Sequence, residues 1–187
     1  MSSARELLPV AADEFTRRVH AISPDAWTND TPDSDWTVRD LVNHLVSEHL
    51  WALPLLAGQS MIEVGDRFDG DVVDGDPIAA WDSAIQASLP AWASADDDDS
   101  VSLSSGSTQV RRYAEEMLMD LTVHSWDLSR GIGYHDRIDQ ACVEHVLAYV
   151  EANIDGLRAY DGLFGAEVET TSLDPQDRLL ALLGRRP

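Results

Sequence analysis

Apolar side chains recur every three to four positions through most of this chain, and that spacing predicts amphipathic helices. In the first such segment, residues 3–22, the repeat is carried by Leu8, Ala11, Phe15, Val19 and Ile22. The same spacing predicts further helices over residues 38–55, 77–93, 108–130, 138–160 and 175–183. The alternation in Val101-Ser102-Leu103 predicts one short extended piece.

Local start signals support these helices. Thr37-Val38-Arg39-Asp40 resembles a capping box with aspartate in the usual glutamate position, and Asp76-Pro77 places an N-cap before a first-turn proline. Segments 23–36 and 58–76 are rich in Pro, Gly or Asp and are expected to be loops. Helices joined by loops predict an all-α bundle, and a length of 187 residues predicts a single domain over residues 1–187.

The composition of the chain limits the kinds of binding partner and the cellular location that we expect for the protein. The formal net charge is −21, and all 13 basic residues are arginine. Such a surface repels phosphate backbones and anionic lipids, so we expect no nucleic-acid partner and no membrane partner. No apolar run approaches the roughly 18 residues of a membrane span, and the N-terminus lacks a signal-peptide pattern. The single cysteine, Cys142, permits no internal disulfide, which favours a cytoplasmic location.

The helix expected over residues 108–130 carries two polar residues where a bundle core prefers apolar ones. Asp120 and His124 lie four positions apart and therefore share one helix face with Met117 and Leu121. A lone buried carboxylate is unfavourable by several kcal/mol unless it is paired or bound to a metal. Two alternatives follow from the spacing: a two-ligand metal site, or an ordinary hydrogen-bonded Asp–His pair inside the bundle.

The helix expected over residues 38–55 offers a third ligand. His44 and Glu48 share a face, and His49 follows directly after Glu48. At about 100° per residue the apolar stripe of this helix centres nearer His49 than His44. Periodicity alone therefore favours His49 as the buried histidine and leaves His44 at the edge of the stripe.

Three motifs resemble one known family. Residues 36–45 (Trp-Thr-Val-Arg-Asp-Leu-Val-Asn-His-Leu) resemble the second helix of the DinB-like metal-binding bundles. Residues 124–133 resemble the His-x-Trp-Asp-Leu-x-Arg-x-x-Gly signature of the branch that includes the N-terminal domain of mycothiol-dependent maleylpyruvate isomerase. Residues 176–185 resemble the usual ending of that branch. The resemblance implies a DinB-like four-helix bundle, here with an additional short C-terminal helix.

The same resemblance implies one divalent metal ion, bound by His44, Asp120 and His124. Zinc is the default ion, and nickel, iron and manganese are alternatives. The isomerase has glutamate at the position of Asp120; aspartate is one methylene shorter, so it must approach the ion more closely. The resemblance covers only the first domain of the isomerase, so we do not expect maleylpyruvate isomerisation from this chain.

An open metal site in this family implies a metal-dependent S-transferase or related detoxification enzyme. Its cosubstrates would be a low-molecular-weight thiol of the mycothiol or bacillithiol type and an electrophile. A non-catalytic metal- or small-molecule-binding stress or sensor module is the alternative, and a homodimer is compatible with the family. Glu48 is expected to accept a proton near the ion or to be solvated. Asp127 is expected to orient a ligand histidine or to pair with Arg130 or Arg111.

Overall fold

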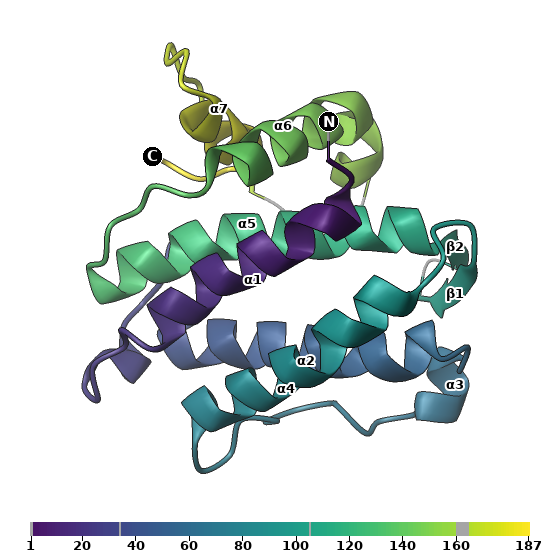
Figure 1. Ribbon diagram of the computed structural model, residues 1–187. Coiled ribbons are helices and arrows are strands. Elements are labelled where there is room, and N and C mark those ends of the chain that lie inside the picture. Colours follow the sequence, from purple (N-terminus) through teal and green to yellow (C-terminus); the bar gives the residue numbers. More distant parts are fainter. Residues whose placement is uncertain (1, 34, 105, 160–164) are drawn as a thin grey trace.

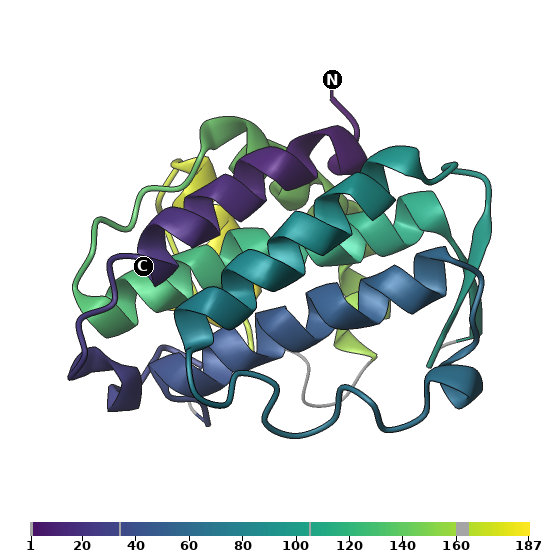
Figure 2. The ribbon, with the colours of Figure 1, turned by 60° about the horizontal axis from the view of Figure 1, so that its bottom comes forward.

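The computed structural model describes residues 2–33, 35–104, 106–159 and 165–187. Four long helices in this part of the chain pack as a bundle: α1 (Ala4–Val19), α2 (Val38–Leu56), α4 (Pro77–Ser94) and α5 (Val110–Ile132). α1 packs against α4 and α5, and α2 packs against the same two helices (Figures 1 and 2). The resulting core is all-α, as the sequence predicts.

Two further helices lie outside the bundle. α6 (Gln140–Arg158) packs on α5 and α1, and α7 (Pro175–Leu182) packs on α6, on the side of α5 away from α2 (Figure 1). After α7 the chain turns back, and the backbone N–H of Arg185 donates to the carbonyl of Leu180 over 2.8 Å. The additional C-terminal helix is therefore confirmed, and it holds the last residues close to the bundle.

Short elements complete the fold. They are the 3₁₀ turn η1 (Ala26–Thr28), the helical turn α3 (Met61–Val64) and the antiparallel strands β1 (Ser100–Leu103) and β2 (Gly106–Gln109), with Ser100 opposite Gln109. The extended piece predicted at Val101–Leu103 is thus one arm of a hairpin. The sequence prediction of a loop over residues 58–76 missed α3, whose capping box joins Ser60 and Glu63.

Capping side chains fix where the long helices begin. The Thr37 hydroxyl accepts from the backbone N–H of Asp40, and the Asp40 carboxylate accepts from the N–H of Thr37. Asp139 caps α6, so this helix begins at Gln140 and not at Ile138 as predicted. The predicted end of that helix, residue 160, lies outside the described residues. No helix among the described residues is long and apolar enough to cross a membrane.

One glycine lets α5 approach the start of α2. A Cβ on Gly131 would lie 2.8 Å from Cγ2 of Val38, so a larger residue here would push the two helices apart. Two turns before Gly131, His124 faces the same neighbour. The close approach therefore helps to set the distance between His124 on α5 and the side chains of α2 that it faces.

Candidate metal centre

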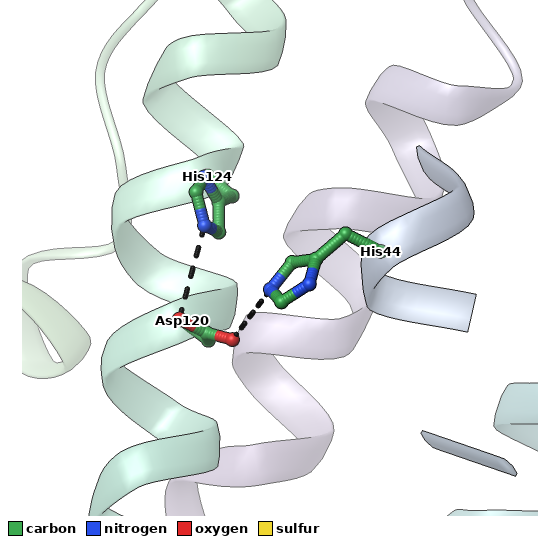
Figure 3. Close-up of side chains that lie close together, drawn as sticks. All are labelled: His44, Asp120 and His124. Atoms are coloured by element: carbon green, nitrogen blue, oxygen red, sulfur yellow. Dashed lines mark hydrogen bonds and ion pairs between the residues drawn. The ribbon is translucent and has the colours of Figure 1, made fainter. Parts of the chain in front are cut away.

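Two helices bring three ligand-type side chains together. His44 projects from α2, while Asp120 and His124 project from one face of α5, and all three point toward one another (Figure 3). His44 Nε2 lies 2.9 Å from Asp120 Oδ2, and His124 Nε2 lies 3.8 Å from Asp120 Oδ1. One ligand atom from each residue lies within 4.8 Å of the other two, close enough for one ion to contact all three.

The three side chains are unequally exposed. The His124 side chain is 8% exposed, whereas those of His44 and Asp120 are 26% and 28% exposed. The site is therefore closed behind His124 and open on the side of His44 and Asp120. Such an opening is what a bound water, thiol or substrate needs in order to reach an ion held by three protein ligands.

Without an ion, His44 and Asp120 stabilise each other's charged forms. Burial lowers the pKa of His44, but the charge and hydrogen bond of Asp120 outweigh burial and raise this pKa above its ordinary value. Burial raises the pKa of Asp120, but His44, His124 and Arg185 outweigh it and hold the pKa low. A divalent cation between the two would take the place of the imidazolium proton as the partner of the Asp120 carboxylate.

Glu48 lies one turn after His44 on α2. Burial and the neighbouring Asp120 carboxylate raise the pKa of Glu48 to about 7, although the positive charge of His44 opposes the shift. A carboxyl group with this pKa can exchange a proton at neutral pH.

His49 lies in the interior of the bundle and is not part of the cluster. It is fully buried, its Nδ1 lies 2.8 Å from the Ser88 hydroxyl on α4, and its ring meets Trp81 edge-on at 5.4 Å. Burial lowers the pKa of His49 to about 3, so the ring is neutral. The apolar stripe of α2 therefore identifies the buried histidine correctly, but the side chain of His49 contacts α4 and does not join Asp120 and His124 of α5.

Asp127 is fully buried and contacts His124. Its Oδ2 lies 3.0 Å from His124 Nδ1 and 2.9 Å from Nη2 of Arg185. Neither of the arginines considered from the sequence is its partner: Arg130 pairs with Asp136, and Arg111 pairs with Asp98. Sequence spacing missed Arg185 because it lies 58 residues from Asp127 and reaches it only through the fold of the tail.

A second group with ligand-type atoms is formed by Asp33, His124 and Asp127. The Arg185 guanidinium already contacts both carboxylates of this group, at 3.1 Å from Asp33 and 2.9 Å from Asp127. The positively charged Arg185 side chain thus occupies the position that a metal ion would take in this second group. The metal centre supported by the geometry is the cluster of His44, Asp120 and His124.

Trp36 forms a wall of the candidate metal centre. The loop before α2 is closed by the Thr31 hydroxyl, which donates to the Trp36 carbonyl over 2.9 Å. The Trp36 ring stacks at a tilt on His44 at 4.6 Å and on His124 at 5.6 Å between ring centroids. This aromatic wall restrains both imidazoles, a role that spacing along the chain does not reveal.

An open cleft of about 520 Å³ adjoins the candidate metal centre at His44 and Trp36. Its lining includes His44, Trp36, Phe68, Asp35 and Asp69, together with other residues of α2 and the loop after α3. Ser47 donates to the carbonyl of Phe68 over 3.0 Å and holds that loop along α2. The cleft therefore gives solvent access to the candidate metal centre from the side of His44.

Comparison with known families gives one match. Residues 8–129 match the family described as mycothiol maleylpyruvate isomerase N-terminal domain. Comparison with curated proteins gave no match, and comparison with solved structures gave none. The matched range includes His44, Asp120, His124 and Asp127, and it ends before the tail that carries Arg185.

Proposed function

The chain belongs to the mycothiol maleylpyruvate isomerase N-terminal domain family, and from this membership and the site geometry we propose that it is a metal-dependent thiol S-transferase or a related detoxification enzyme. One divalent ion would be held by His44, Asp120 and His124. The observation that carries the proposal is that these side chains converge from α2 and α5, with ligand atoms within 4.8 Å of one another, beside an open cleft.

The donor set fits a borderline divalent ion. Two imidazoles and one carboxylate are ligands that catalytic zinc sites use, and three protein ligands leave a position for a further group. Zinc is therefore the first choice, with nickel, iron or manganese as alternatives set by availability. An ion in such a site lowers the pKa of a thiol or water that binds it.

The residues of this chain suit thiol chemistry around that ion. Glu48, with a pKa of about 7, would accept the thiol proton as the thiol enters. The thiol sulfur would then form a bond to carbon of the electrophile, and the leaving group, such as a halide, would depart with the electron pair of the broken bond. Asp127 would keep the His124 ring oriented throughout. Trp36 and Phe68 would contact the electrophile along the cleft.

Metal analysis of the purified protein tests the first half of the proposal. We expect about one equivalent of divalent metal in the wild-type protein, because Arg185 contacts one of the two ligand groups found among the described residues and leaves the other for an ion. Triple alanine replacement of His44, Asp120 and His124 should abolish it. His20→Ala is a matched control, since it removes an exposed histidine that pairs with Asp82 at 2.8 Å outside the cluster. Equal metal content in the triple variant would overturn the proposal.

A thiol assay tests the second half. Cobalt-substituted protein should change its visible spectrum when mycothiol or bacillithiol is added, and the metal-loaded protein should join the thiol to a haloaromatic acceptor faster than the apo protein does. Metal binding with neither response would identify a binding module without turnover and would overturn the transferase activity.

A further inference from the structure

The residues after α7 place a buried arginine beside Asp127, the carboxylate that contacts His124. Arg185 is 7% exposed, and its Nη2 contacts Asp127 Oδ2 at 2.9 Å and Asp33 Oδ2 at 3.1 Å. Its Nε points to the other oxygen of Asp127 at 3.4 Å. Its Nη1 donates to the carbonyl of Leu183 over 3.0 Å, so the guanidinium is fixed by both its own tail and the bundle.

The contact continues from Asp127 to His124. An ionised carboxylate only accepts hydrogen bonds, so the 3.0 Å contact places the proton of the His124 imidazole on Nδ1. With its proton on Nδ1, the imidazole carries its lone pair on Nε2, which is the atom on the Asp120 side of the ring. Arg185, Asp127 and His124 therefore form a continuous chain of polar contacts that ends at a ligand atom.

We propose that Arg185 is a positioning residue for the metal centre. It holds Asp127 in the one place from which that carboxylate fixes the orientation and tautomer of His124. Asp127 is fully buried, and without the guanidinium it would be a buried charge facing only the imidazole. It would then be free to turn away, and that movement releases His124. The inference rests on the proposed metal centre and extends it to a residue outside the family match, which ends at residue 129.

Electrostatics alone predicts the opposite outcome for loss of this arginine. A guanidinium near a divalent cation repels it, so removal of the positive charge should tighten metal binding if Arg185 acted only through its charge. A positioning role predicts weaker binding, because an ill-oriented ligand is lost from the coordination shell. The sign of the change in metal affinity therefore separates the two roles.

The test compares Arg185→Gln with Arg186→Gln. Arg186 is exposed and adjacent, so the control removes the same formal charge from nearly the same place. Zinc affinity is measured by competition with a chromophoric chelator, beside thermal unfolding of the apo proteins. We expect Arg185→Gln to weaken zinc binding about 10–100-fold, the effect usual for residues that orient a ligand, and Arg186→Gln to change it less than about 3-fold. Unchanged or tighter binding in folded Arg185→Gln overturns the inference.

A measurement on the wild-type protein keeps the inference testable if Arg185→Gln fails to fold. Long-range ¹H–¹⁵N correlation of the imidazoles in the metal-free protein at pH 8 should show His124 protonated on Nδ1. The Asp33→Asn variant weakens the second carboxylate contact of the Arg185 guanidinium, so the signal of the proton on His124 Nδ1 should weaken. Protonation on Nε2 in the wild-type protein overturns the inference. Absence of zinc binding by the wild-type protein would instead overturn the proposed function itself, so the two failures are distinguishable.

Discussion

His44 and His49 lie on one helix, five residues apart, in opposite surroundings. His44 is partly exposed, pairs with Asp120 and adjoins a cleft, whereas His49 is sealed between Ser88 and Trp81. The environment raises the pKa of His44 and lowers that of His49 to about 3. The more deeply buried His49 packs in the bundle, whereas His44, at the edge of the apolar stripe, is the candidate metal ligand. A metal-binding side chain must be accessible from solvent.

Removal of His44 should have the largest effect on zinc binding. His44→Ala takes one of three ligands from the proposed ion, so zinc affinity should fall by about a thousandfold, more than the effect of losing an orienting partner. The free energy of unfolding of the apo protein should fall by about 1 kcal/mol or less, because the variant removes the hydrogen-bonded partner of Asp120 but the pair is partly exposed. Chelator competition and thermal unfolding measure the two quantities, and near-wild-type affinity in this variant would contradict the proposed centre.

Removal of His49 should give the reverse pattern. His49→Ala leaves a cavity beside Trp81 and orphans the Ser88 hydroxyl, so the free energy of unfolding should fall by about 2–4 kcal/mol. Zinc affinity of the folded fraction should stay within a few-fold of wild type. Urea unfolding checks the stability, and a large loss of zinc affinity without loss of stability would show that the two histidines are not separate in function.

The pH dependence of stability should report on the buried His49 and on Glu48, the neighbour of His44 on α2. Because burial lowers the folded-state pKa of His49 to about 3, the unfolded chain binds more protons as pH falls below 6.5, and stability declines there. Glu48 acts in the opposite sense: its folded-state pKa of about 7 lies above the ordinary 4.5, so its destabilising effect is present above pH 7 and fades as pH falls toward 4.5.

These two contributions oppose each other between pH 4.5 and 6.5. Glu48→Gln should therefore make the apo protein more stable at pH 8, by on the order of 2 kcal/mol, with the gain vanishing near pH 5. The same variant should expose the acid sensitivity that arises from His49. Urea midpoints of the metal-free proteins from pH 5 to 8 measure this, and a pH-independent difference between Glu48→Gln and wild type would refute the raised pKa.

The smallest expected effect concerns the cleft. Asp35 and Asp69 line it and are exposed, so they should disfavour anionic electrophiles by screened repulsion. In the proposed transferase, the double variant Asp35→Asn, Asp69→Asn should raise kcat/KM for an anionic acceptor about 3-fold at low salt and leave a neutral acceptor unchanged. The double variant Asp13→Asn, Asp155→Asn, at exposed positions on α1 and α6 outside the cleft lining, removes the same charge and is the matched control. Equal gains in both double variants would assign the effect to net charge alone.

The long helices follow from local pattern, as α2 and α5 show. The capping box at Thr37 and the repeat of apolar residues place α2 within one residue of its predicted end at Leu55. The four-residue spacing of Asp120 and His124 likewise puts them on one face whatever surrounds the helix. The helical turn α3 escaped prediction because four residues are too few to show a period.

The amino-acid sequence determined the bundle class, the positions of the long helices and the pairing of Asp120 with His124, because these depend on contacts within one or two helical turns. Periodicity within α2 favoured His49 and the family resemblance implied His44; the tertiary structure places His44 beside that pair and adds Asp33, Trp36 and Arg185 around it. Such choices depend on which face of α2 turns toward α5 and where the tail returns. Packing between distant segments sets both, and the spacing of residues along one helix carries no record of it.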